Sequence, residues 1–355
     1  MPAPPNFTSL ATSTLQNVNS TVVDNIYNAF PLLKKMRAEG GFTTRMGGKR
    51  IDVNLVWQKD TDAGSDVGAQ SFDGYDTVSV TPWEDTTNSF ASWKNLHVPV
   101  TISEVEKAQN RGKAMIFDLL KNKTKNATKA GQNKLTTVLF ADGTGNGGKD
   151  PTGLKDLIRI DPTTSTSIQN INQSTYSFWR NKANASIDTG ITGAALTSTS
   201  TFSATSYFTR MMSNQRNNCS RGSQLREDRP NLGITTQVLF ETYKNSLLDK
   251  VRYQTSDASK NLGVDEYVMF ENMPLIWDPA LATETINSIT GTSRIYLINT
   301  NFLQVVIDEG YDWKMFPAMS PVDQYAYVSK MMWRGNLVCT DRTRQGVISG
   351  FTTNS

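Results

Sequence analysis

The chain has 355 residues, which is enough for roughly two domains with a core of their own. Its 36 Lys and Arg against 33 Asp and Glu leave a net charge of only +3, which excludes a whole-molecule basic coat for nucleic acid. One histidine and two distant cysteines, Cys219 and Cys339, exclude a histidine metal site, a zinc module and a disulfide scaffold.

The sequence also shows no membrane-spanning segment and no secretory signal. No stretch approaches the roughly 18 apolar residues that a membrane helix needs, so we expect no membrane partner. The first residues, Met1-Pro2-Ala3-Pro4-Pro5, lack the basic and apolar regions of a secretory signal. We therefore expect the chain to remain in the cytoplasm in which it is made.

The first predicted element is a helical arm. Apolar residues recur every three or four positions between Thr8 and Met36, which predicts one covered helix face interrupted near Pro31. The next segment is basic, because residues 34–50 hold six basic side chains and one acidic, a net charge of +5. The members of this N-terminal basic cluster are Lys34, Lys35, Arg37, Arg45, Lys49 and Arg50.

A long two-stranded excursion follows. Residues 51–57 alternate apolar and polar side chains, as a strand with one covered side does, and residues 96–102 repeat the pattern and predict the returning strand. Between them, residues 58–76 hold five Asp and one Lys, a net charge of −4, and three glycines. We call Asp60, Asp62 and Asp66 the acidic tip.

A long basic helix comes next. Ser103 and Glu106 form a capping box that predicts a helix start, and an apolar stripe continues to Ala141 with a possible interruption at Gly112. Residues 107–134 hold eight basic side chains against one acidic, a net charge of +7. We call Lys121, Lys125 and Lys129 the helix lysines. Opposite charge on two separate segments favours contact between the acidic tip of one subunit and a basic surface of another.

The glycine-rich segment from Asp142 to Asp150 resembles three ligand motifs, and each lacks a required part. Asp150 stands where a phosphate-binding loop needs Ser or Thr, and Gly153 stands where a calcium loop needs a bidentate Glu. A dinucleotide fingerprint would follow a strand, whereas this segment follows a helix. We predict a helix end and a turn, with no cofactor and no metal.

No arrangement of nucleophile and base is visible. His97 is the only imidazole, it lies in a predicted strand, and no Gly-x-Ser-x-Gly elbow accompanies it. We therefore predict a surface histidine, no catalytic residue and no enzyme activity.

The second half of the chain predicts a further lobe beginning near Pro230. A helix is expected over 206–217, a strand over 234–240, a helix over 241–253 and further strands up to Ile307. The tail predicts strands over 324–333, 337–340 and 346–351, a bulge at Gly335 and a polar turn over 342–345.

In this order the elements resemble the major capsid proteins of tailed bacteriophages, whose fold is shared with encapsulin shells. Gly153-Leu154-Lys155-Asp156-Leu157-Ile158 and Phe178-Trp179-Arg180-Asn181 look like the Gly-Leu-x-x-Leu-Ile and Trp-Arg-Asn landmarks of that family. The resemblance implies an α+β fold. It places an N-terminal arm at 1–48, an extended β-hairpin loop at 49–102, a spine helix and peripheral domain at 103–229, an inserted axial domain at 230–320, and a closing β hairpin of the peripheral domain at 321–355.

The resemblance implies a structural protein that self-assembles into the hexamers and pentamers of an icosahedral phage head. Such a head encloses double-stranded DNA without sequence-specific binding, and its partners are portal, scaffolding and decoration proteins. The chain would be found in the virion capsid, and in the host cytoplasm during assembly. Inter-subunit contact residues are expected to be the acidic tip together with the helix lysines or with Lys34, Arg37 and Arg45.

Some members of the family join subunits through Lys–Asn bonds. Lys59 lies near the acidic tip, but the turn at 342–345 offers no asparagine, so we predict noncovalent assembly. The alternatives are an encapsulin-like compartment, a β-rich carbohydrate-binding protein, which the tryptophans and the many Thr and Asn residues allow, and a nucleotide-dependent enzyme built on Gly143 to Lys149.

Overall fold

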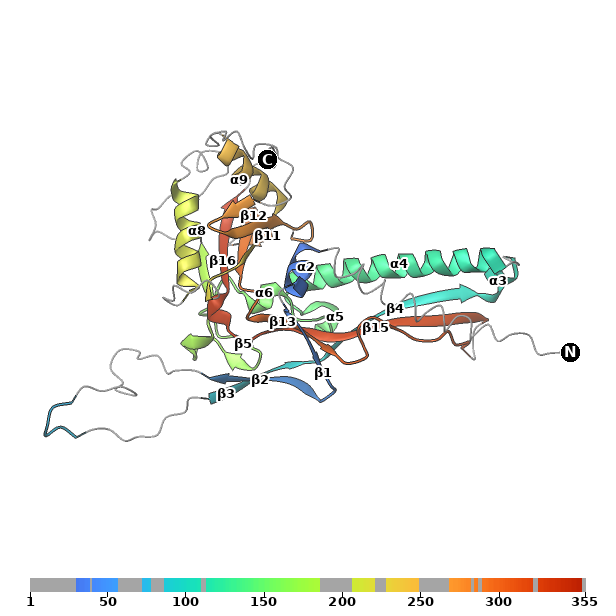
Figure 1. Cartoon of the computed structure of the whole chain (residues 1–355), viewed down its shortest axis with the longest axis horizontal. Helices are drawn as coiled ribbons and strands as arrows, with labels where there is room; N and C mark the ends of the chain where they lie inside the picture. The colour runs from blue at the N-terminus through green and yellow to red at the C-terminus, as the bar shows by residue number, and fades with distance from the viewer. Residues whose placement is uncertain are drawn as a thin grey trace.

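The computed structural model describes residues 30–38, 40–56, 72–77, 86–109, 113–185, 206–220, 228–248, 268–281, 284–286, 289–321 and 325–352. Figure 1 shows an elongated molecule in which one long helix and two long strands extend to one side of a base, and a second sheet rises from that base. None of the helices in these ranges is both long enough and apolar enough to span a bilayer.

The extension is built on β15 (Ala326–Cys339), a 14-residue strand. Its first part pairs antiparallel with β4 (Lys94–Ser103), and its last part pairs antiparallel with β13 (Leu303–Asp308). β1 (Phe42–Arg45) lies parallel to β13, and β14 (Lys314–Met315) pairs with the middle of β15. We call the paired part of β4 and β15 the arm.

Three expectations for this sheet are wrong. The strand over 96–102 pairs with β15 and not with the strand over 51–57, because alternation indicates a covered face and not a partner. The two tail strands over 324–333 and 337–340 are one strand. Gly335 is no bulge, because it is in regular register on both edges, opposite Ile307 of β13 and opposite Lys94 of β4. A Cβ at Gly335 would lie 2.6 Å from the carbonyl oxygen of Val306, so the position requires glycine for close approach.

The predicted long helix forms as α3 (Glu104–Gln109) and α4 (Lys113–Phe140), and the expected interruption at Gly112 lies outside the described residues. The capping box is confirmed. The N–H of Val105 donates to Oγ of Ser103 over 3.3 Å, and the N–H of Ser103 donates to Oε2 of Glu106 over 3.2 Å.

One face of α4 covers the arm (Figure 1). Ala127, Leu135 and Val138 of the helix share the main core with Leu96 and Val100 of β4. The apolar stripe of the helix and the apolar face of the strand therefore remove each other from water.

α2 (Pro31–Ala38) is the described end of the predicted N-terminal helix, and residues 1–29 lie outside the described part. Pro31 occupies the first helical position, where its missing N–H removes no helix hydrogen bond. Leu32, Leu33 and Met36 are buried in the main core, and α2 lies close to the C-terminal end of α4 (Figure 1).

β2 (Arg50–Val56) and β3 (Thr86–Ser92) pair as the base of the predicted hairpin, and these two strands lie on the other side of the molecule from the free end of the arm (Figure 1). Apolar residues of β2 are buried in a cluster with residues of β13, β15 and η1 (Ser177–Trp179), so the hairpin base rests on the first sheet. A small hairpin of β5 (Ser167–Ile168) and β6 (Ile171–Asn172) contacts it through the N–H of Phe90, which donates to the carbonyl of Gln169.

The second sheet has seven strands in the order β7-β16-β12-β8-β10-β9, with β11 beside β12. Its strands are β7 (Lys182–Ala185), β8 (Leu232–Thr235), β9 (Val268–Phe270), β10 (Met273–Trp277), β11 (Glu284–Ile286), β12 (Ile289–Ile298) and β16 (Gly346–Thr352). α8 (Ser206–Asn218), which the sequence predicts, and α9 (Gln237–Leu248) bury apolar side chains in the core of this sheet.

The strand expected over 234–240 ends at Thr235, because α9 begins at Gln237. Leu239, Phe240 and Tyr243 are buried while Val238 is exposed, which is helical spacing concealed in an unbroken apolar run. β15 and β16 lie in different sheets, so residues 321–355 do not pair with each other as a hairpin.

Candidate functional site

The predicted contact residues fall in three places. The acidic tip, Asp60, Asp62 and Asp66, lies outside the described residues. Lys125 and Lys129 are exposed on α4. Lys121 belongs to the same helix, but its side chain is not among those that the structure describes. Lys34 and Arg37 are exposed on α2.

Arg45, another predicted contact residue, has a hydrogen-bond partner in its own chain. It is half-buried at the end of β1, where Nη1 donates to the carbonyl of Asp52 over 2.6 Å. Arg45 therefore helps to hold β1 beside β2.

α2 and α4 present two separate basic surfaces. Lys34 and Arg37 belong to α2, which lies near the C-terminal end of α4 (Figure 1), and Lys125 and Lys129 lie along the exposed face of α4.

An ion pair fixes α3 against α4. Nζ of Lys123 donates to Oε2 of Glu106 over 2.7 Å and to the carbonyl of Thr101 over 2.8 Å. The hydrogen bond from Lys123, aided by the N–H of Ser103, holds the pKa of Glu106 below its ordinary value of 4.5. Because the folded pKa is the lower one, this contribution is present above pH 4.5 and is lost as the pH falls through the lowered pKa.

We therefore expect amide hydrogen exchange in residues 104–109 to accelerate, relative to unfolded peptide, as the pH drops below the ordinary carboxyl value. Glu106→Gln removes the titrating group while keeping an acceptor for the N–H of Ser103. That variant should show faster exchange at neutral pH and no such acceleration on acidification. An identical pH response in both proteins would contradict the assignment.

The glycine-rich segment after α4 forms the predicted turn. It contains the short helix α5 (Gly145–Gly148), in which Asn146 and Gly147 have left-handed backbone. Oδ1 of Asp142 accepts from Oγ1 of Thr144 over 2.7 Å, which lowers the pKa of Asp142, and Oδ2 of Asp150 pairs with Nζ of Lys134 over 2.9 Å. One carboxylate therefore has its partner within the turn and the other has its partner on α4, and no group of potential metal ligands gathers among the described residues.

The remaining candidates for catalysis are the histidine and the two cysteines. His97 is exposed on β4, as the sequence predicts. Cys219 and Cys339 are both buried, and burial raises the pKa of each thiol to about 12, so neither supplies a thiolate at neutral pH.

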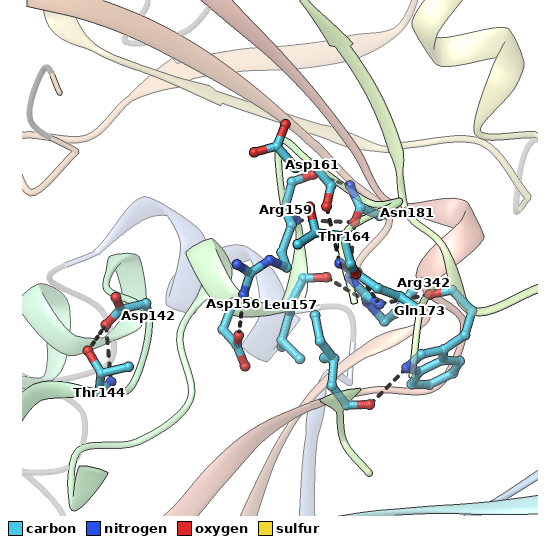
Figure 2. A network of polar contacts seen from close by, with 12 residues as sticks. Asp142, Thr144, Asp156, Leu157, Arg159, Asp161, Thr164, Gln173, Asn181 and Arg342 are labelled. Atoms are coloured by element: carbon cyan, nitrogen blue, oxygen red, sulfur yellow. Dashed lines mark hydrogen bonds and ion pairs between the residues drawn. The ribbon is translucent and has the colours of Figure 1, made fainter. Parts of the chain in front are cut away.

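The most connected polar group lies at the base of the arm, and the sequence analysis missed it. The turn over 342–345 exists as the 3₁₀ turn η4 (Arg342–Arg344), but Arg342 is completely buried. Figure 2 shows its guanidinium at the centre of a network. Nε donates to the carbonyl of Leu157 over 2.8 Å, Nη1 to the carbonyl of Trp179 over 2.8 Å, and Nη2 to Oδ1 of Asn181 over 3.0 Å.

The amides around Arg342 are held in place by backbone groups. Nδ2 of Asn181 donates to the carbonyl of Arg159 over 2.7 Å, and Nε2 of Gln173 donates to the carbonyls of Asp161 and Thr164, each over 3.1 Å (Figure 2). Both amide oxygens therefore face the guanidinium, and Nη1 and Nη2 also donate to Oε1 of Gln173. Burial lowers the pKa of Arg342 to about 10, so the side chain stays positively charged at neutral pH.

The two landmark segments meet at this network. Leu154, Leu157 and Ile158 are buried in the main core, and Gly153, the N-cap residue of α6 (Leu154–Leu157), lies against the last turn of α4. The segment 178–181 supplies Trp179 and Asn181 to Arg342. Arg342 thus joins α6, which follows α4, to the chain that connects the two sheets.

A second set of contacts ties the sheets together beside η4. Gln345 and Asn299 exchange two hydrogen bonds of 2.9 Å between side chain and backbone. Arg344 pairs with Asp228 over 3.0 Å and with Asp341 over 3.3 Å. These contacts hold the β12–β13 and β15–β16 connections side by side where the chain passes from one sheet to the other.

No family model and no curated protein sequence matches the chain. Solved structures do match. The cyanophage A-1(L) capsid protein is 14% identical, with a TM-score of 0.55 over 89% of this chain and 93% of that one. The SrpI encapsulin of Synechococcus elongatus PCC 7942 is 7% identical, with a TM-score of 0.52 over 90% of this chain and 89% of that one.

The capsid protein of Myoviridae phage XM1 is 9% identical, with a TM-score of 0.52 over 88% of this chain and 90% of that one. The chain therefore has the α+β fold that phage capsid proteins share with encapsulins. The fold that the sequence resemblance implied is confirmed.

Proposed function

We propose that this chain is the structural subunit of an icosahedral phage head, assembling as hexamers and pentamers around double-stranded DNA. The observation that supports the proposal is the extent of the fold likeness, which spans 88–90% of the chain in the three structures above. Proteins with this shape act by association, and the proposal assigns the chain no catalytic step.

The five segments implied by the resemblance are proposed as the working parts of the subunit. Residues 1–48 are the N-terminal arm, 49–102 the extended loop, 103–229 with 321–355 the peripheral domain, and 230–320 the axial domain. The proposed partners are copies of the chain and portal, scaffolding and decoration proteins, in the host cytoplasm during assembly and in the finished virion.

Electron microscopy with sedimentation of the full chain, expressed alone and with its neighbouring genes, tests this proposal. Closed shells or hexameric rings are the expected result. A homogeneous monomer under all conditions, above all one that binds saccharides, would overturn the proposal in favour of a β-rich binding protein.

An encapsulin-like compartment is the second candidate, because the SrpI encapsulin shares the fold as closely as one of the phage capsids does. The contents of purified shells separate the two functions. Nuclease-protected DNA supports a phage head, whereas a co-purifying protein cargo in nucleic-acid-free shells supports a compartment.

Charge contacts between subunits are proposed to join the acidic tip to the helix lysines or to Lys34, Arg37 and Arg45 of a neighbour. Exposed ion pairs contribute only about 0.2 to 1 kcal/mol each, so assembly depends on many of them and weakens in high salt. We expect Asp60→Lys, Asp62→Lys and Asp66→Lys together to raise the protein concentration needed for assembly, measured by light scattering at low salt.

Charge exchange identifies the partner surface. Reversing Lys34 and Arg37 to Asp in the same chain, with Arg45 left in its hydrogen bond to Asp52, should restore assembly if that cluster is the partner. Reversing the helix lysines should restore assembly if they are the partner. Unchanged assembly at low salt of the variant that carries Asp60→Lys, Asp62→Lys and Asp66→Lys would rule out the acidic tip as a contact.

A further inference from the structure

The exposed face of α4 is unusual in its charge. Residues 119–141 contain five lysines and no Asp or Glu. The described side chains on the exposed side are amides, lysines and small residues, whereas Thr124, Ala127, Thr128, Leu135 and Val138 face the core. The exposed members are Asn122, Lys125, Asn126, Lys129, Ala130, Asn133, Lys134 and Thr137.

Two of the lysines already have acidic partners in their own chain. Lys123 pairs with Glu106, and Lys134 pairs with Asp150. Lys125 and Lys129 make no ion pair with any described residue. They are four positions apart, so they lie on one side of the helix with their Cα atoms separated by about 6 Å along its axis.

This face has the composition of a polyanion contact and lacks that of a protein contact. Protein interfaces have apolar and aromatic anchors at their centre. None of the exposed side chains described on α4 is a large apolar one. Ammonium and amide donors without a competing carboxylate suit phosphate oxygens, which carry charge but no sequence information.

We propose that Lys125 and Lys129 bind the phosphate backbone of the enclosed double-stranded DNA, so that α4 lines the inner wall of the shell. The inference rests on the proposed function and assigns an inside and an outside to the subunit. Contact with a neighbour's acidic tip then falls to Lys34, Arg37 and Arg45.

The opposite face of the arm provides a matched control. Met331 and Trp333 of β15 belong to the core that α4 covers, so Lys330 projects from the other face of the strand. Lys314 of β14 is in register with Met332 and is exposed on that same opposite face. Changing Lys314 and Lys330 removes the same charge as changing Lys125 and Lys129.

The test measures binding of the unassembled full-length chain to a 20-base-pair duplex, by fluorescence anisotropy at several salt concentrations. Lys125→Ala with Lys129→Ala should reduce the slope of log affinity against log salt by about 1.8, because each lost phosphate contact removes about 0.9. Lys314→Ala with Lys330→Ala should leave the slope unchanged. An equal slope in all three proteins overturns the proposal.

Electron microscopy of the same variants separates this inference from the proposed function. Normal shells from the Lys125 and Lys129 variant, holding less nuclease-protected DNA than the control, support the inference. Loss of shells in that variant alone overturns it and makes the two lysines subunit contacts. If the unchanged chain forms no shells at all, the proposed function fails, while the duplex titration still reports on the phosphate site.

Discussion

Replacing Arg342 with alanine is expected to lower the free energy of unfolding by about 3 kcal/mol or more. The substitution leaves the carbonyls of Leu157 and Trp179 buried without a donor, and each unsatisfied group costs about 1 to 3 kcal/mol. It also opens a cavity beside the Trp179 ring, whose centre lies 5.9 Å from the guanidinium carbon. Urea titration of the protein, followed by tryptophan fluorescence, measures the loss.

Two further substitutions make this result specific. Arg159→Ala removes an arginine of the same network whose side chain is about one-third exposed and, among the described residues, forms an ion pair only with Asp156, and we expect a loss within about 1 kcal/mol. Arg342→Lys retains the charge without the planar donor fork, so we expect it to recover part of the lost stability. Equal effects of Arg342→Ala and Arg159→Ala would contradict the central role of Arg342.

Gly153→Ala is expected to lower the free energy of unfolding by about as much as Arg342→Ala does, for a steric reason. A Cβ at this position would lie 2.5 Å from the carbonyl oxygen of Val138 and 2.8 Å from that of Leu139, and closer still to that of Ala141. These are backbone atoms of the last turn of α4 and the residue after it, so the landmark segment must move away from the helix. Overpacking that shifts backbone costs about 1 to 3 kcal/mol and sometimes more.

Gly74→Ala is the matched control, because a Cβ there meets nothing within 4 Å and the backbone is not left-handed. We expect that variant to unfold at the same urea concentration as the unchanged protein. If Gly153→Ala fails to accumulate in soluble form while Gly74→Ala does, the comparison of yields gives the same answer. Equal stability of the two variants would show that Gly153 is replaceable.

Local periodicity in the sequence predicts elements well where one face is buried. α4 and β2 follow their apolar patterns closely, because the helix lies on the arm and the hairpin base lies on the first sheet. The same patterns leave partners open. Residues 96–102 show a covered face equally well whether the neighbouring strand is β2 or β15, and only tertiary pairing decides between them.

The candidate site likewise has one part that the sequence predicts and one part that it does not. The exposure of Lys125, Lys129 and Lys34 follows from charge, because an unpaired ammonium group is rarely buried. The burial of Arg342 cannot be predicted from the neighbouring residues in the sequence. Its partners are carbonyl and amide oxygens of segments more than 150 residues away in the chain. The landmark motifs mark those segments, but nothing in either motif indicates an arginine near the C-terminus.

The placement of β15 and β16 governs when the two sheets can be completed. β15 lies between β4 and β13, β16 lies between β7 and β12, and both strands come later in the sequence than all of these partners. A chain synthesised only as far as β13 therefore lacks an inner strand of each sheet. Such long-range pairing makes folding slow, because distant segments must meet before either sheet is complete.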